Sequence, residues 1–172
     1  MDSLPKVTIG LPVKNGERYI NFALDSVIEQ SYPNIELIIS INISSDNTYD
    51  IVDKYKKKYS WIKVFKQKIN LSLPENFKFV LQKAKGHLFM WLSDDDYISK
   101  NYIKNLSYFL LSNKKCCVVQ SKTQLISLPN FKKKEIIRFA KNNIVFKPNE
   151  VIKNLLSEKK FNYYYFGLFR TS

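Results

Sequence analysis

The sequence predicts an α/β domain with a central sheet of mostly parallel strands and helices on both faces. Two observations lead to this prediction. Over about the first 120 residues, apolar runs of strand length alternate with segments in which apolar residues recur at helical spacing. Each connection between successive strands can also hold a helix, and such crossovers make consecutive strands parallel. A chain of 172 residues is expected to form one domain around a single core, here 1–172.

The expected elements follow one another without a break as far as residue 119. In order, they are a strand over residues 7–11 that ends at Pro12, a helix over 17–30, a strand over 37–39 with residues 40–42 at its end, a helix from Asp46, a strand over 61–65, a helix from Pro74 to Gly86, a strand over 87–92, a helix over 102–110 and a strand over 116–119.

The strands and the helices are recognised by different signals. The strands are short runs rich in Val, Ile and Leu, which suits a sheet that is buried on both faces. Each helix carries its apolar residues on one stripe, and in the first helix these are Ile20, Ala23, Leu24, Val27 and Ile28. Pro74 suits the first position of a helix, and Gly86 suits a helix end.

Beyond residue 120 the pattern loosens. Pro129, Lys132–Lys134 and Asn142–Asn143 indicate loops around short elements, and a helix is expected over 149–158. The apolar stretch 161–170 ends without a polar tail, so we expect the fold to be incomplete at its C-terminus.

The composition excludes several classes of protein. The chain is 45% hydrophobic with four Gly and six Pro, which excludes a disordered or collagen-like protein. No apolar run reaches the ~20 residues of a membrane-spanning helix, and the N-terminus lacks the pattern of a secretory signal. The only cysteines, Cys116 and Cys117, are adjacent and are expected to be reduced thiols of a cytoplasmic protein.

The charge is strongly positive: 28 Lys and Arg face 15 Asp and Glu, for a formal net charge of +13. Between Asp96 and Glu135 there are eight Lys and no acidic residue. Because nearly all these cations are Lys, sequence-specific nucleic-acid binding is not expected. Attraction of phosphates or of an anionic membrane fits better, and a merely solvated basic surface stays open as the alternative.

Polar side chains gather where three of the expected strands end. The segments are 11–17, 40–46 and 93–96. In a parallel sheet, ligands bind beyond the carboxyl ends of the strands, so these segments are expected to line one cleft.

The third of these segments contains three adjacent aspartates, Asp94, Asp95 and Asp96. Adjacent carboxylates repel one another unless water or a cation compensates their charge. A Mg²⁺ or Mn²⁺ ion held by one or two carboxylates and by substrate phosphates is the usual solution. A solvated turn before the helix near Ser99 is the alternative. The sequence has none of the glycine patterns GxGxxG, GxxxxGK[ST] or GxSxG, which argues against a dinucleotide site, a P-loop and a serine-hydrolase elbow.

Taken together, these segments resemble a family 2 glycosyltransferase of GT-A fold. The resemblance rests on the strings VTIGLPVKNGE, ALDSVIEQSYPNIELIIS, SSDNT and AKGHLFMWLSDDD. It covers residues 6–112 with clear motifs and the remainder more loosely, including Gly167–Arg170. It implies a Rossmann-like nucleotide-sugar-binding half over 6–112 and the start of an acceptor-binding half over 113–172.

The resemblance also implies roles for single residues. Pro12 and Val13 would line the nucleoside pocket, with Asn15 and Glu17 close by. Asn42 would lie near the base, and Asp94 would face the ribose or pyrophosphate. Asp95 and Asp96 would be the ligands of a Mn²⁺ or Mg²⁺ ion. Two positions depart from the family pattern, which usually has Asp where this chain has Ile41 or Asn42, and often has Asp at Ser93. The catalytic base is expected beyond Ser172.

The function implied is transfer of a sugar from a nucleotide diphospho-sugar, expected to be a UDP-sugar, to a glycan or lipid-linked acceptor in cell-surface polysaccharide synthesis. The implied reaction is inverting and metal-dependent. Peripheral contact with an anionic membrane at the inner face of the cell is part of the same expectation. Two alternatives stay open: a catalytically inactive nucleotide-binding module, and a basic RNA- or membrane-binding domain.

Overall fold

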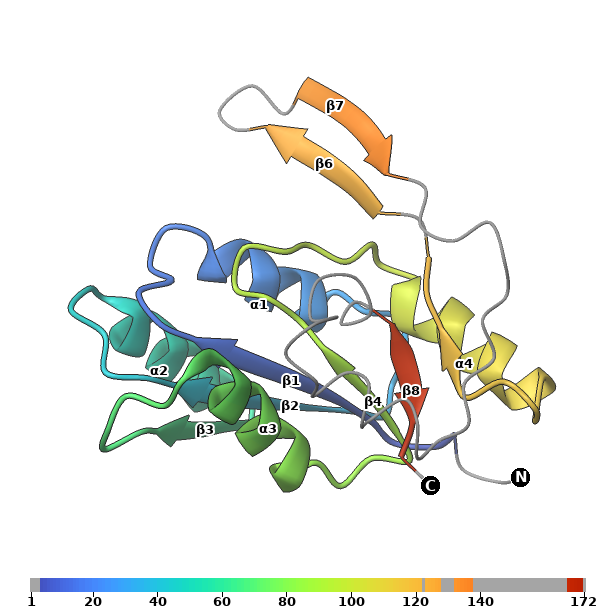
Figure 1. Cartoon of the computed structure of the whole chain (residues 1–172), viewed down its shortest axis with the longest axis horizontal. Coiled ribbons are helices and arrows are strands. Elements are labelled where there is room, and N and C mark those ends of the chain that lie inside the picture. Colours follow the sequence, from blue (N-terminus) through green and yellow to red (C-terminus); the bar gives the residue numbers. More distant parts are fainter. Residues whose placement is uncertain (1–3, 122, 128–131, 138–166, 172) are drawn as a thin grey trace.

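The structure is a computed structural model that describes residues 4–121, 123–127, 132–137 and 167–171. Figure 1 shows the elements in chain order, which are β1 (Val7–Val13), α1 (Ile20–Ile28), β2 (Ile35–Ile41), α2 (Thr48–Lys58), β3 (Ile62–Lys66), α3 (Leu73–Lys83), β4 (Leu88–Trp91), α4 (Tyr102–Ser112), β5 (Val118–Val119), β6 (Thr123–Ser127), β7 (Lys132–Ile137) and β8 (Leu168–Arg170). In this part of the chain, no helix combines the length and the apolar character needed to cross a membrane.

The central sheet has six strands in the order β3-β2-β1-β4-β8-β5. The strands β1 to β4 are parallel, and β8 runs antiparallel between β4 and β5. The predicted α/β fold with a mostly parallel sheet is therefore confirmed. The strand order reverses between β1 and β4, because β2 and β3 lie on one side of β1 and β4 lies on the other. Such a reversal is the point at which open α/β sheets bind ligands.

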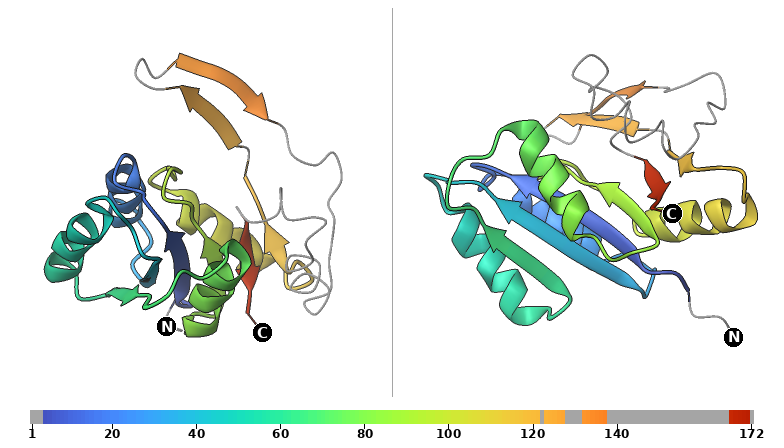
Figure 2. Two further views of the ribbon diagram at one scale, coloured as in Figure 1. Left: turned by 60° about the vertical axis from the view of Figure 1, so that its left-hand side comes forward. Right: turned by 60° about the horizontal axis from the view of Figure 1, so that its bottom comes forward.

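Helices cover both faces of the sheet. Side chains of α1, α2 and α4 share one apolar core with Val7, Ile9 and Leu11 of β1. The opposite face packs against α3, and Figure 2 (right) shows α3 in front of the strands with α1 behind them. Gly10 lies on the α3 side, where a Cβ atom would be 2.7 Å from Val80 and 2.8 Å from the Phe89 ring. The absence of a side chain at this position lets α3 approach the sheet.

Pro12 does not end the first strand as predicted, because β1 continues to Val13. Pro12 is paired in register with Ser40 of β2. The Gly10 carbonyl accepts from Leu92 on the β4 side, and the Val13 carbonyl accepts from Asn42 on the β2 side. Because the backbone groups of successive residues face β2 and β4 in turn, a backbone N–H at position 12 would face β4. The pairing of β1 with β4 ends at Gly10, so proline at position 12 costs no hydrogen bond of the sheet.

The region after residue 112 differs most from the sequence prediction. Lys132–Lys134, predicted as a loop, belongs to β7, which pairs with β6 in a hairpin that stands away from the main sheet in Figures 1 and 2. The predicted strand 116–119 is shortened to β5, and the apolar stretch 161–170 provides β8. The pairing of β8 with β4 and β5 joins residues distant in sequence, which local patterns do not reveal. The β6–β7 hairpin is local, but three consecutive lysines lack the alternation of apolar and polar residues that indicates a strand. The predicted helix over 149–158 lies outside the described residues.

The amino-terminal edge of the sheet is held by a buried carboxylate. Glu36 is 3% exposed and accepts hydrogen bonds from Thr8 Oγ1 (2.7 Å) and from the Lys85 backbone N–H (2.8 Å). Its other oxygen lies 2.5 Å from Lys63 Nζ. Burial alone would raise the pKa of Glu36, but the hydrogen bonds from Lys63, Thr8 and Lys85 lower it overall. Gly86 packs here, where a Cβ would be 2.7 Å from the Lys6 carbonyl oxygen.

Replacing Glu36→Gln is expected to destabilise the protein at pH 7 by about 1–3 kcal/mol, because the charged partner of Lys63 is lost. Since the folded pKa of Glu36 is lowered, its contribution is complete above the unfolded value of 4.5 and is lost as the pH falls through the folded value. Urea unfolding at pH 7 and at pH 3 measures this. Glu29→Gln, at the exposed residue directly after α1, is the control and should shift stability by less than about 0.5 kcal/mol. An equal loss for both variants would contradict the assignment.

Candidate functional site

The segments that follow β1, β2 and β4 come together at the carboxyl edge of the sheet, beside the reversal in strand order. The backbone N–H of Asn15 donates to Ser44 Oγ over 3.1 Å, which joins the first two segments. Gly16 lies against the side chain of Asp94, which joins the first to the third. The three segments that the sequence placed in one cleft are therefore neighbours.

Asn15 and Glu17 connect the loop after β1 to the loop after β2. Asn15 has a left-handed backbone with φ of +54°, which asparagine tolerates well. Its Oδ1 accepts the Ser45 backbone N–H over 2.9 Å. The carboxylate of Glu17 accepts from both the backbone N–H (3.0 Å) and the side-chain amide (2.8 Å) of Asn47. These two bonds lower the pKa of Glu17, and they turn its charge toward the second loop.

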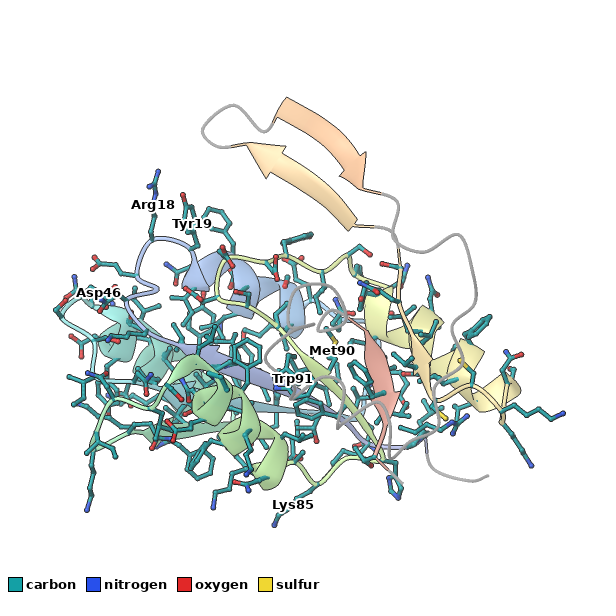
Figure 3. All side chains as sticks on the ribbon, viewed as in Figure 1. Arg18, Tyr19, Asp46, Lys85, Met90 and Trp91 are labelled. Atoms are coloured by element: carbon teal, nitrogen blue, oxygen red, sulfur yellow. The ribbon has the colours of Figure 1, made fainter. Side chains whose placement is uncertain are left out.

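Asp46 and Thr48 complete this connection from the other side. Asp46 Oδ2 accepts the Glu17 backbone N–H over 2.9 Å, and its Oδ1 accepts from the Thr48 hydroxyl over 2.5 Å. Thr48 Oγ1 in turn accepts the Gly16 N–H over 2.8 Å. Partial burial would raise the pKa of Asp46, but these hydrogen bonds lower it overall. Figure 3 shows Asp46 beside the start of α2, with Arg18 and Tyr19 on the neighbouring loop after β1.

Residues 93–96 form a turn with three aspartates, which we call the acidic turn. Its first aspartate, Asp94, packs against Gly16. A Cβ atom on Gly16 would lie 2.5 Å from Asp94 Oδ2 and 2.6 Å from Val13 Cγ2, so only glycine leaves room for this carboxylate. Burial raises the pKa of Asp94, and the negative charges of Asp95 and Asp46 raise it further. The negative charge of Asp94 is thus unfavourable unless a positive charge lies nearby.

Asp95 and Asp96 differ in their surroundings. Asp95 is exposed, whereas Asp96 is turned inward, and its Oδ2 is buried with no hydrogen-bond partner among the described residues. Burial, followed by the charge of Asp95, raises the pKa of Asp96 to about 6. The backbone N–H of Asp96 donates to the Ser93 carbonyl over 3.2 Å, which closes the turn.

A divalent cation would suit this turn. The described residues contain no group of three His, Cys, Asp or Glu side chains arranged around one metal position. Mg²⁺ and Mn²⁺ at nucleotide sites, however, take one or two carboxylates from the protein and the remaining oxygens from phosphate and water. The unpartnered oxygen of Asp96 and the repulsion between Asp95 and its neighbours both fit such an ion.

Three of the other predicted residues lie at the ends of β1 and β2. Pro12 and Val13 are buried at the end of β1, directly before the loop that contacts Asp94. The side-chain amide of Asn42 makes two hydrogen bonds with the backbone of Leu71. Its Nδ2 donates to the Leu71 carbonyl over 2.9 Å, and its Oδ1 accepts the Leu71 N–H over 3.1 Å. Asn42 therefore holds the segment before α3 next to β2. Ile41 is 1% exposed within the apolar core, so this position serves packing.

The sequence by itself suggests no individual role for Gly16, Asp46 or Thr48. The Asn-Gly pair directly after a buried strand indicates a turn. In the structure Asn15 takes the left-handed backbone, and Gly16 is required for the space beside Asp94 instead. An Asp two residues before a Thr at the start of a helix similarly indicates hydrogen bonds from side chain to backbone. Neither signal reveals that these residues join two loops about 30 residues apart in the chain.

Comparison with known proteins agrees with this architecture. The family described as "Glycosyl transferase family 2" matches residues 8–170. A glycosyltransferase of Haemophilus influenzae is 32% identical over 111 residues, which are 64% of this chain and 44% of that protein. The Staphylococcus aureus poly(ribitol-phosphate) beta-N-acetylglucosaminyltransferase TarS is 32% identical over 108 residues, which are 61% of this chain and 19% of that protein. The chain thus spans less than half the length of these relatives.

Two solved structures share the fold. Residues 1–349 of S. aureus TarS in complex with UDP match with a TM-score of 0.62 and 29% identity, over 67% of this chain and 34% of that chain. The mannosyltransferase PcManGT from Pyrobaculum calidifontis, in complex with GDP-Man and Mn²⁺, matches with a TM-score of 0.63 and 19% identity, over 69% and 36%. These matches confirm the predicted GT-A fold.

Replacing Gly16→Ala is expected to lower stability by about 1–3 kcal/mol, because the added methyl group overlaps Asp94 and Val13. Urea unfolding measures the loss. The exposed neighbour Ser45→Ala keeps its backbone bond to Asn15 and serves as the control, with an expected change below about 0.5 kcal/mol. A Gly16→Ala protein as stable as the original would show that the two segments are not in this close contact.

Proposed function

Because the chain belongs to glycosyl transferase family 2, we propose that it transfers a sugar from a nucleotide diphospho-sugar to a glycan or lipid-linked acceptor in cell-surface polysaccharide synthesis. The observation that carries this proposal is the acidic turn at the reversal in strand order, in contact with the loop after β1. That place is where an open α/β sheet binds a nucleotide. The relatives TarS and the Bacillus spizizenii poly(ribitol-phosphate) beta-glucosyltransferase support an acceptor at the cell surface.

In this proposal, Pro12 and Val13 line the nucleoside pocket, and Asp94 faces the ribose or pyrophosphate. Asn15 and Glu17 contribute by holding the loop beside them in place, as their bonds to the second loop support. Asp95 and Asp96 would hold Mn²⁺ or Mg²⁺. Such an ion, when bound, stabilises the negative charge of the departing nucleoside diphosphate.

The donor proposed is a UDP-sugar. Structures of S. aureus TarS contain UDP and UDP-GlcNAc, at 28–29% identity to this chain. Asn42 is proposed to lie near the base, and its hold on Leu71 would then shape that side of the pocket. We further propose an inverting reaction, in which a carboxylate base deprotonates the acceptor hydroxyl.

An inactive nucleotide-binding module would share this site, so binding alone does not distinguish the two functions. Incubation with UDP-GlcNAc and Mn²⁺, followed by measurement of released UDP with and without candidate acceptors, separates them. Release of UDP supports a transferase. Tight binding of UDP without any release supports the inactive module.

Asp95→Ala is expected to abolish divalent-dependent nucleotide binding and to leave the fold intact. Removal of one carboxylate relieves repulsion within the turn but takes away the exposed ligand of the cation. Isothermal titration with UDP, with and without Mn²⁺, measures the affinity, and thermal unfolding checks the fold. Asp50→Ala, an exposed aspartate on α2, is the control for the change in charge. Unchanged affinity in Asp95→Ala would remove Asp95 from the metal site.

We also propose a cytoplasmic protein in peripheral contact with the anionic inner face of the cell membrane, through the outer side of α4. This helix buries Ile103, Leu106, Ser107 and Leu110 and exposes three large side chains, Tyr108 (48%), Phe109 (50%) and Leu111 (37%). Exposed lysines at 104, 114 and 115 lie on or directly after the same helix. Apolar side chains flanked by lysines are typical of helices that lie at a membrane interface.

Changing Lys104, Lys114 and Lys115 together to Gln is expected to reduce co-sedimentation with anionic vesicles at least tenfold. Each lysine near an anionic surface contributes roughly 1 kcal/mol before salt screening. The matched control changes Lys56, Lys57 and Lys58 of α2 to Gln, with the same loss of charge at a different place. Equal recovery on neutral and anionic vesicles, or equal effects of the two triple variants, would contradict this contact.

A further inference from the structure

The end of α1 is bound by hydrogen bonds to the segment that follows the acidic turn. This segment, residues 98–103, connects the turn to the first residues of α4. Its partners are Ser26, Gln30 and Ser31, which lie about 70 residues earlier in the chain. These three belong to the string DSVIEQS, for which the sequence suggested no chemical role.

Gln30 is the centre of this contact. Its Nε2 donates to the Ser26 carbonyl (2.9 Å), which keeps the side chain aligned along α1, and to the Ser99 carbonyl (2.9 Å). Its Oε1 accepts the backbone N–H of Ile103 over 3.0 Å. One amide thus binds both the loop and the first turn of α4, and it satisfies backbone groups that have no partner within a helix.

Two serines extend the contact on either side of Gln30. Ser26 is buried, and its Oγ accepts the Ile98 backbone N–H over 3.3 Å. The backbone N–H of Ser31 donates to the Lys100 carbonyl over 2.9 Å, and its hydroxyl donates to Asn101 Oδ1 over 2.7 Å. We call Ser26, Gln30 and Ser31 the α1 clamp.

The α1 clamp lies on one side of the acidic turn, and β4 lies on the other. Just before the turn, Leu92 donates to the Gly10 carbonyl over 3.0 Å and so belongs to the sheet. Just after it, Ile98 is bound by Ser26. Only residues 93–97 lie between the two attachments, and three of them are carboxylates that repel one another.

We propose that Gln30, supported by Ser26 and Ser31, is a positioning residue that holds the acidic turn in the shape that binds the cation and the diphosphate. The ligand named in this inference rests on the proposed function, whereas the positioning of the turn rests on the hydrogen bonds alone. The apolar side chains of Ile98 and Ile103 anchor the same segment in the core. Apolar packing keeps this segment in the core but does not determine the exact position of its backbone. The hydrogen bonds of the α1 clamp are directional and therefore determine that position.

Gln30→Ala is the principal test, with amide hydrogen exchange on the ligand-free protein and Mn²⁺-dependent UDP titration as its two readouts. We expect the Asp96 amide, which closes the turn, to exchange at least tenfold faster, while the Leu92 amide in the sheet is unchanged. We expect UDP affinity in the presence of Mn²⁺ to fall about tenfold. Ser31→Ala, which removes one side-chain bond and keeps the backbone bond, should give a two- to threefold effect and retain the fold.

Two controls separate positioning from general destabilisation. Glu36→Gln lowers stability at the opposite edge of the sheet, and it should leave both the Asp96 exchange rate and the UDP affinity unchanged. Gln82→Ala removes an exposed glutamine of α3 and should change neither. The inference is overturned if the Asp96 amide exchanges at the same rate in Gln30→Ala and Ser31→Ala as in the original protein. This holds whether or not the protein binds UDP. Failure of the original protein to bind UDP, with faster Asp96 exchange in the variants, removes the proposed ligand and supports the positioning.

Discussion

Repulsion among the carboxylates of the acidic turn is the constraint on which this edge of the sheet depends. Asp94 and Asp96 are partly withdrawn from water, and burial and neighbouring charges raise the pKa of both. A free turn of this kind would move its carboxylates apart into solvent. Here β4 holds it on one side, the α1 clamp holds it on the other, and Gly16 packs against Asp94. The negative charge therefore stays concentrated where a cation and a diphosphate can compensate it.

Buried carboxylates lie at both ends of the sheet strands, but their surroundings shift their pKa values in opposite directions. At the amino-terminal edge, Glu36 has a lysine and several donors around it, and its pKa is lowered. At the carboxyl-terminal edge, Asp96 has an oxygen without a hydrogen-bond partner among the described residues, and its pKa is raised. The first arrangement stabilises the fold by itself. The second gains from a ligand, as expected of a binding site.

Much of the fold could be predicted from the sequence, because its first 112 residues build local elements with strong periodicity. The alternation of short apolar strands and amphipathic helices predicted β1 to β4 and the four helices, with differences at the ends. The predictions failed after residue 112, for two different reasons. Lys132–Lys134 was predicted to be a loop and is a strand of a local hairpin, because three consecutive lysines lack the alternation that indicates a strand. β8 enters the main sheet between β4 and β5, which lie far earlier in the chain, and no local pattern describes such partners.

For the site, the sequence alone determined the residue types and their order: polar segments after three strands, an aspartate triplet after a buried strand, and motifs of a known family. Because carboxyl ends of parallel strands share an edge, it also determined that these segments would meet. Only the tertiary structure decided what each side chain does there. Asn42 and Glu17 are used in bonds between loops, Gly16 makes room for Asp94, and Gln30 reaches a segment about 70 residues away. Hydrogen bonds and close contacts of this kind depend on distances of a few ångströms, which arise only once the strands and helices have packed.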